Sequence, residues 1–473
     1  MKTPQRSKKK VALFWGLILL PACIAIFFYV DSEQRYYESF QYNLQADYHY
    51  AFPQNSASPV TLKENGFQWP LSKTGADTAF LKIPVRADWT SIFFLPYVEI
   101  RYRGIVVKQY FEKTCRGVRY LNLSPVLKAV PPLTEGDELV IKKHHISWDQ
   151  GPSELYCFQN SELKKARILI LSPHPDDAEI ATFGLYNDQD AYIITLSAGE
   201  GGKTKYKKFF KDLKKHSLFQ GKVRTWDSLV LPFWGGISPQ KCFNLGYFDG
   251  TLKAMFYDPA RKAFSSLAET SDLNTFRQYN LSDLLPRYTV QEPTWNNLVG
   301  DLVLLLNEIN PSIIVTPNPL TDGHPDHQYT TLALLEALQR TPAVKGNLYL
   351  YTVHAAYAAR WPFGTAKSVV SLPPFFSKLP FFEKIYSLHL PLDVYIRKFF
   401  AIDDMHDIRP VYFLSPQQNT EPWPNALQSL YLHWKGALTM RKYLRMDELF
   451  FVTSTENAPF LRETSLKNLA PED

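Results

Sequence analysis

Residues 167–179, RILILSPHPDDAE, contain the pattern that decides the fold. An apolar run, residues 168–171, leads directly into a loop that two prolines stiffen and that is rich in His and Asp. Apolar runs without polar alternation are typical of strands buried on both faces of a parallel sheet. A helical pattern over residues 177–187 and a second apolar run over residues 191–196 follow. We therefore predict a strand–helix–strand unit around this stretch.

The same alternation of strand and helix continues along the chain. Residues 295–310 have a helical apolar pattern, residues 311–316 form another apolar run, and residues 328–339 are again helical in pattern. The predicted fold class over residues 166–473 is α/β, with a Rossmann-like, mostly parallel sheet and helices on both faces. Ligands of such sheets bind beyond the carboxyl ends of the strands.

A second cluster, residues 322–327 (DGHPDH), follows the predicted strand 311–316. Two histidines and one carboxylate are a common catalytic zinc set, and the two clusters supply it as His174, Asp177 and His327. Asp176 would then be free to accept a proton, and His324 to protonate a leaving group. In either cluster alone, the Asp residues have an alternative interpretation as simple helix caps. The two clusters together favour a Zn²⁺ site.

The HPDDAE motif with a distant HPDH motif resembles the zinc-dependent PIG-L (LmbE-like) de-N-acetylase family, over about residues 166–330. The resemblance implies hydrolysis of an N-acetyl group on a sugar. It also implies roles for six residues: His174, Asp177 and His327 as zinc ligands, Asp176 as general base, and His324 as general acid or electrostatic partner, oriented by Asp326.

Three further short motifs share this resemblance. Gly-Glu, Arg with an acidic residue three positions later, and Asp-Gly make Glu200, Arg224 and Asp249 the candidates for holding sugar hydroxyls. The sequence departs from the family at residues 180–184, where bulky residues replace small ones, and at Asp322, where some members have tyrosine. What stabilises the tetrahedral oxyanion besides the metal is therefore left open.

Residues 31–165 have a different pattern, with short aromatic and β-branched runs separated by turn residues. This spacing predicts an all-β sandwich of antiparallel strands, for which we expect a role in positioning the glycan or docking a partner. Cys115 and Cys157 both lie in this region. The sequence alone leaves open whether they form a disulfide.

Residues 11–30 contain no charge, and a helix of twenty residues spans about 30 Å, the thickness of a bilayer core. Five basic residues lie within residues 1–10, which predicts a cytoplasmic tail and a single-pass anchor in the inner membrane. Everything after the anchor would then lie in the periplasm or another extracytoplasmic space. A cleaved signal peptide is the alternative, but the apolar stretch is long and does not end in small residues.

The net charge of +6 comes almost entirely from that tail, because 47 basic and 46 acidic residues remain without its five. A near-neutral body argues against a nucleic-acid partner. We expect a membrane-anchored enzyme that removes N-acetyl groups from a cell-envelope polysaccharide or glycolipid, with envelope-glycan synthesis or export proteins as partners. The alternatives are a metal-dependent hydrolase of another amide or ester, and a glycan-binding or assembly protein with an inactive domain.

Overall fold

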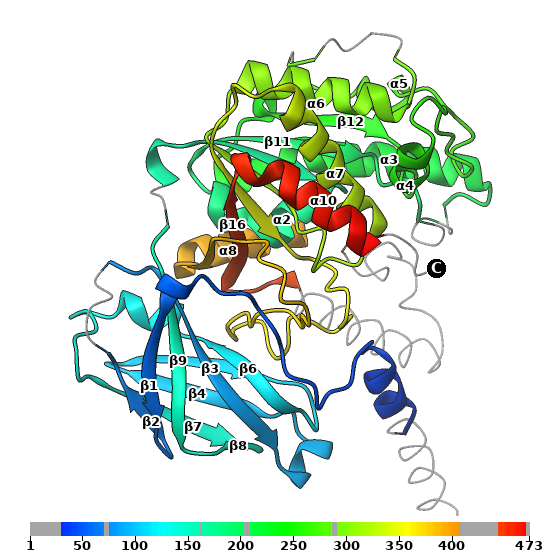
Figure 1. Ribbon diagram of the computed structural model, residues 1–473. Coiled ribbons are helices and arrows are strands. Elements are labelled where there is room, and N and C mark those ends of the chain that lie inside the picture. The colour runs from blue at the N-terminus through cyan, green and yellow to red at the C-terminus, as the bar shows by residue number, and fades with distance from the viewer. Residues whose placement is uncertain are drawn as a thin grey trace, which may run out of the picture.

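The computed structural model describes residues 30–70, 75–160, 163–202, 206, 209–282, 284–285, 291–406, 408 and 443–469. The predicted anchor, residues 11–30, lies outside the described residues except for its last position. Among the helices that are described, none is both long and apolar enough to cross a membrane. The chain has a mixed α/β fold, as predicted, with a β-rich part below a larger α/β part in Figure 1.

The β-rich part consists of two antiparallel sheets that share one apolar cluster. In β7, buried Leu139 and Ile141 alternate with exposed Glu138 and Val140, so one face of the strand points to the core. Cys115 and Cys157 are both buried in this core, and no disulfide joins them. The first sheet contains β1 (Ala57–Leu62), β9 (Gly151–Phe158), β3 (Thr78–Ala87), β6 (Arg116–Asn122) and β8 (Ile146–Trp148). The second contains β2 (Gly66–Gln68), β7 (Glu138–His144), β4 (Tyr97–Tyr102) and β5 (Ile105–Tyr110).

Residues 30–56 do not contribute a strand to either sheet, although we expected the sandwich to begin at residue 31. Residues 30–38 are helical, and the chain then follows the α/β part through bridges that pair Phe40 with Ala358 and His49 with Phe376. The strands of the β-rich part therefore span residues 57–158.

Aromatic side chains fill the boundary between the two parts. Tyr50 stacks on Phe451 with ring centroids 5.7 Å apart, and it also contacts Phe375. Phe52 stacks on Tyr156 of β9 at 3.9 Å. Aromatic rings bury large areas and add specific ring–ring contacts, so this boundary holds the parts together.

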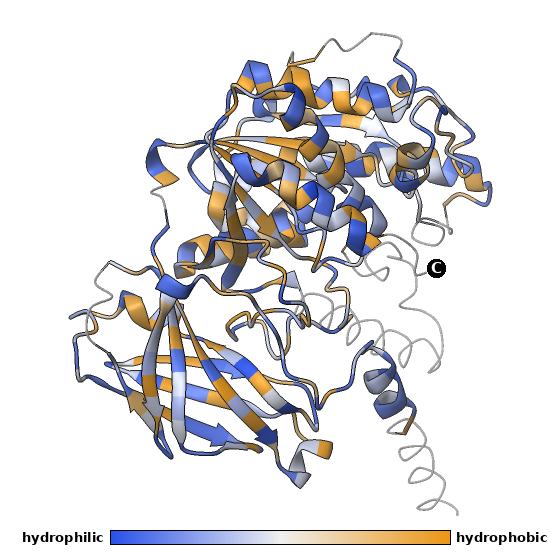
Figure 2. Ribbon diagram, in the orientation of Figure 1, coloured by the Kyte–Doolittle hydropathy of each residue, from blue (hydrophilic) through white to orange (hydrophobic). Residues whose placement is uncertain are grey.

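The α/β part is built on a seven-stranded sheet with the order β12-β11-β10-β13-β14-β16-β15. The first five strands are parallel to one another, and β16 alone runs in the opposite direction, pairing antiparallel with β14 and with the edge strand β15. Figure 2 shows hydrophobic residues along its central strands. Its strands are β10 (Arg167–Ser172), β11 (Asp190–Ser197), β12 (Cys242–Tyr247), β13 (Ile313–Pro317), β14 (Asn347–Tyr351), β15 (Lys384–His389) and β16 (Asp447–Ser454).

The strand order reverses between β10 and β13, because β11 and β12 lie on one side of β10 while β13 and β14 lie on the other. Such a reversal is a topological switch point, and the loops that leave the two strands there diverge to form a crevice. The predicted clusters follow these two strands.

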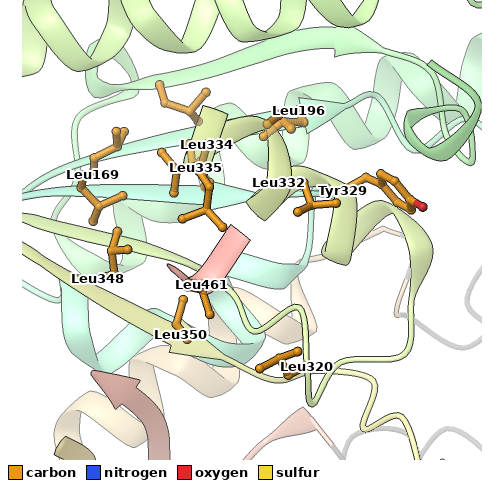
Figure 3. Close-up of a cluster of buried hydrophobic side chains, with 14 of the residues drawn as sticks. Leu169, Leu196, Leu320, Tyr329, Leu332, Leu334, Leu335, Leu348, Leu350 and Leu461 are labelled. Carbon is orange, nitrogen blue, oxygen red and sulfur yellow. The ribbon is translucent and has the colours of Figure 1, made fainter. Parts of the chain in front are cut away.

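Helices cover both faces of this sheet. Leu169 and Leu171 of β10 belong to one apolar cluster, while Ile168 and Ile170 belong to another on the opposite face. Figure 3 shows the first cluster, in which Leu169 lies with leucines from α7 and α10. The helices are α2 (Asp177–Tyr186), α3 (Leu213–Val230), α4 (Leu252–Tyr257), α5 (Asn274–Arg277), α6 (Trp295–Ile309), α7 (Pro325–Arg340), α8 (Leu392–Asp403) and α10 (Ala458–Leu469).

Helix α7 begins at Pro325, three residues before the predicted start at Gln328. Proline suits the first turn of a helix because the missing N–H has no partner there, and the His324 side chain accepts a hydrogen bond from the Asp326 N–H as the N-cap. The second half of the DGHPDH motif is therefore helical.

A buried ion pair fixes α2 against α8 and β16. Lys398 Nζ lies 2.7 Å from Glu448 Oε1, and both side chains are buried. The Glu448 carboxylate also accepts hydrogen bonds from the backbone N–H groups of Gly184 and Leu185 in α2. Asp176 and Asp177 lie at the opposite, N-terminal end of α2. The contact with Glu448 therefore helps to fix the helix that carries them.

We expect Lys398→Met to lower the free energy of unfolding by about 3 kcal/mol, because it leaves the Glu448 carboxylate buried without its cation. Urea denaturation followed by circular dichroism measures the change. The double variant Lys398→Met/Glu448→Gln is the control, and it should recover part of the loss. A stability of Lys398→Met equal to that of the unmodified protein would contradict this account.

Candidate metal centre

The two motif loops meet at the switch point of the sheet. The first loop joins β10 to α2, and the second joins β13 to α7. His174 and Asp177 come from the first loop and the first residue of α2, whereas His327 lies in the first turn of α7. Residues about 150 positions apart in the chain therefore face one another.

Three donor atoms converge within this crevice. His174 Nδ1 lies 3.3 Å from Asp177 Oδ2 and 3.3 Å from His327 Nε2, and His327 Nε2 lies 3.1 Å from Asp177 Oδ2. Ligands placed tetrahedrally at about 2.0–2.1 Å from zinc are about 3.3 Å apart. All three side chains are buried. The three predicted ligands therefore fit one small divalent cation, with a fourth position left for water or substrate.

In His174 and His327, the ring nitrogen that faces away from the three converging donor atoms contacts a carboxylate. His327 Nδ1 lies 3.1 Å from Asp322 Oδ2, and His174 Nε2 lies 3.2 Å from Asp326 Oδ2 and 3.3 Å from Asp249 Oδ1. Such partners fix the ring orientation and raise the basicity of a ligating imidazole.

The carboxylates also govern the protonation of the two imidazoles. Burial disfavours the charged form of His327, but Asp177 and Asp322 outweigh it and raise the pKa to about 10. For His174, burial likewise acts against protonation, and Asp177, Asp249 and Asp326 together raise the pKa well above its usual value. A proton and a metal cation compete for each ligating nitrogen because both bind its lone pair, so a metal would displace the proton that these carboxylates favour.

Asp176 lies beside the three donors with its own partner. It occupies the N-cap position of α2, but its side chain makes no capping hydrogen bond. Its Oδ1 lies 3.1 Å from Arg224 Nη2 instead, and its side chain is 23% exposed. The simple helix-cap interpretation therefore does not describe Asp176, whose carboxylate is partly exposed and pairs with Arg224.

His324 lies at the rim, with its ring centroid 4.8 Å from that of His174 and 5.0 Å from that of His327. Because Nδ1 accepts from the backbone N–H of Asp326, the neutral ring carries its proton on Nε2. Burial and the neighbouring His327 and His174 lower the pKa of His324 below its usual value.

Asp326 does not orient His324 through its carboxylate, which is the role that the family resemblance implied. Its carboxylate contacts His174 and accepts hydrogen bonds from the backbone N–H of Gly250 at 2.7 Å and of Leu252 at 3.4 Å. Only the backbone N–H of Asp326 reaches His324. The reason is the early start of α7, which places Asp326 in its first turn, where the carboxylate meets backbone N–H groups of residues that follow β12.

Of the three candidates for binding sugar hydroxyls, Arg224 and Asp249 border the crevice and Glu200 lies behind it. Asp249 contacts His174, and Arg224 contacts Asp176. Glu200 is only 1% exposed, and its carboxylate accepts from the Asp249 N–H and from the Ser265 hydroxyl at 2.7 Å. Burial raises its pKa to about 7. In this arrangement Glu200 supports the Asp249 loop.

Sequence reasoning assigned no role to Asp322 as a ligand partner and overlooked His354. Asp322 is fully buried, and besides His327 it accepts from the backbone N–H groups of Val353 and His354. The His354 ring centroid lies 5.0 Å from that of His327. His354 follows β14, so the rule that sites lie beyond the carboxyl ends of parallel strands was the signal for it.

Donor atoms of His174, His324 and His327 lie within 4.8 Å of one another, and so do those of Asp177, His327 and His354. The His/Asp cluster at the switch point of the sheet can therefore hold a metal ion, as the sites of metal-dependent hydrolases do. Residues 169–338 match the family model described as PIG-L: GlcNAc-PI de-N-acetylase. The match begins in β10, ends in α7 and includes both motif loops. It supports the de-N-acetylase family for this part of the chain and indicates a metal-dependent, de-N-acetylase-like hydrolase.

Among solved structures, the chain is similar to the crystal structure of GalB, the 4-carboxy-2-hydroxymuconate hydratase, from Pseudomonas putida KT2440. The identity is 13%, the similarity covers 61% of this chain and 95% of that chain, and the TM-score is 0.29. No match to a curated protein is found.

Proposed function

We propose that the protein is a zinc-dependent de-N-acetylase that acts on N-acetylated sugars of a cell-envelope polysaccharide or glycolipid. The observation that carries this proposal is the convergence of His174 Nδ1, Asp177 Oδ2 and His327 Nε2 within 3.1–3.3 Å. The partly exposed carboxylate of Asp176 comes from the residue just before Asp177. The family match to a GlcNAc-PI de-N-acetylase model supports the choice of an N-acetylated sugar.

An amide is a poor electrophile with a poor leaving group, so both sides of the scissile bond need assistance. His174, Asp177 and His327 would hold zinc, which when bound would supply a Lewis acid and lower the pKa of a water molecule. Asp176, which Arg224 holds in place, accepts the proton of the attacking water as its oxygen bonds to the acetyl carbon. For the second step His324 acts as the imidazolium: it donates its Nε2 proton to the nitrogen as the carbon–nitrogen bond breaks, and it returns to the neutral ring. The products are acetate and a free amino sugar.

The purified full-length protein in detergent should release acetate from N-acetylated oligosaccharides or from envelope glycans. Treatment with a chelator should abolish this release, and stoichiometric Zn²⁺ should restore it, because the metal is needed for the chemical step. Enzymatic quantification of acetate measures the reaction. Chelator-resistant acetate release would contradict the metal-dependent mechanism, whereas release from other amides alone would replace the proposed substrate class.

We also propose that residues 11–30 anchor the protein in the inner membrane, with residues 1–10 in the cytoplasm and the catalytic part outside it. Twenty uncharged residues follow a tail with five basic residues, and Asp31 and Glu33 come directly after them. An envelope glycan would then lie on the same side of the membrane as the crevice.

A further inference from the structure

Four large apolar side chains are exposed at one end of the β-rich part. They follow β3 in the short helix Trp89–Ile92 and the two residues after it. Trp89 is 75% exposed, Ile92 45%, Phe93 57% and Phe94 58%. We call these four residues the apolar tip. A contiguous apolar patch of this kind on a soluble surface marks a site of interaction with a protein or a membrane.

The backbone of the tip is held firmly although its side chains point outward. Asp88 caps the short helix by accepting a hydrogen bond from the Thr90 N–H at 2.9 Å. Ser91 is fully buried, and its hydroxyl accepts from the Thr114 N–H at 3.3 Å. The hydrogen-bonded backbone therefore holds the side chains of the tip in their exposed positions.

Lys113 connects the tip to residues 30–38. Its ammonium group donates to the backbone carbonyl of Ile92 at 3.0 Å and forms an ion pair with Glu33. Its backbone N–H donates to the Tyr36 hydroxyl at 2.8 Å, and Lys113 itself is buried. The tip and the helical residues 30–38 are thus fixed side by side, at the lower right of the β-rich part in Figure 1.

The position of Glu33 sets how far the tip lies from the proposed anchor. Residues 30–38 are helical, and Glu33 is three residues after Val30, the last residue of the apolar stretch. At 1.5 Å per residue this separation is about 4.5 Å, which is less than one helical turn. The contact between Glu33, Lys113 and the tip backbone therefore begins within one helical turn of residue 30.

We infer that the apolar tip inserts into the lipid bilayer surface beside the anchor and so fixes the orientation of the protein on the membrane. The inference rests on the proposed anchor and is independent of the catalytic proposal. Tryptophan and other aromatic side chains favour the interface between headgroups and acyl chains, which matches the composition of the tip. A helix and a tip that touch the bilayer together leave the protein less freedom to rotate than a single anchor does.

Quenching of tryptophan fluorescence by brominated phosphatidylcholine tests this inference in the full-length protein reconstituted into vesicles. Trp15 lies within the proposed anchor, so all measurements use a Trp15→Phe background. We expect Trp89→Phe to remove most of the lipid-dependent quenching that remains. Trp234→Phe is the matched control, because Trp234 is 37% exposed and stacks on Phe400 in a different apolar surface. This control should leave the quenching unchanged.

Flotation of the vesicles separates the possible failures. If the full-length chain does not float with the vesicles, the anchor and the tip inference both fail, while the proposed enzymatic activity is untouched. If the protein floats but Trp89→Phe does not reduce quenching, the tip inference alone is overturned. A loss of quenching in Trp234→Phe instead would place the bilayer against α8 and would also overturn it.

Discussion

Asp176→Asn is expected to lower kcat by about 10³-fold while the protein keeps its metal. General acid–base catalysis contributes about 10²- to 10⁴-fold to enzymatic rates, and the substitution removes the carboxylate proposed to accept the proton of water. Metal should be retained because the Asp176 carboxylate pairs with Arg224, whereas His174, Asp177 and His327 supply the converging donors. Acetate release under saturating substrate, together with metal analysis of the same samples, measures both quantities.

Asp188→Asn is the matched control for this prediction. Asp188 lies just beyond the other end of α2 with its side chain 59% exposed and pairs with Arg397, so its loss should change neither turnover nor metal content. Undiminished turnover in Asp176→Asn would rule out Asp176 as the base. Loss of the metal would instead show that Asp176 is itself a ligand.

His327→Ala is expected to lower the affinity for zinc by more than about 100-fold and to abolish acetate release. Substitutions of residues that only support a ligand cost about 10- to 100-fold in metal affinity, so removal of a direct donor should cost more. His327 Nε2 lies within 3.3 Å of both other donors, and no rearrangement of a buried ring is needed to bring them together. Competition with a chromophoric chelator measures the affinity.

Two further variants make this prediction specific. Asp322→Asn should cost about 10- to 100-fold in zinc affinity, because it weakens the hydrogen bond to His327 Nδ1 without removing a donor. His354→Ala should retain zinc, although His354, Asp177 and His327 can also bring donor atoms within 4.8 Å of one another. If His354→Ala lost zinc and His174→Ala retained it, the metal ligands would be Asp177, His327 and His354 instead.

Predictions based on local patterns agree closely with the structure in the α/β part. The apolar runs at residues 168–171 and 191–196 lie in β10 and β11, and the helical pattern at 295–310 corresponds to α6, Trp295–Ile309. The strands bury side chains on both faces, which gives continuous apolar runs in the sequence. The helix buries one stripe, which gives apolar residues at helical spacing. The start of α7 was predicted too late because the capping contact of His324 adds helix before any apolar period begins.

The sequence by itself determined which kinds of side chain, His and Asp, supply the site, and after which strands they lie. Two His-Asp clusters after apolar strands were enough to name His174, Asp177 and His327, since parallel strands bring their carboxyl ends to one edge. Only the tertiary structure decided that Asp326 faces His174 and not His324, that Glu200 is buried behind Asp249, and that His354 lies beside His327. These pairings join residues that are distant in the chain, and through-space distances and burial set them without leaving any local period in the sequence.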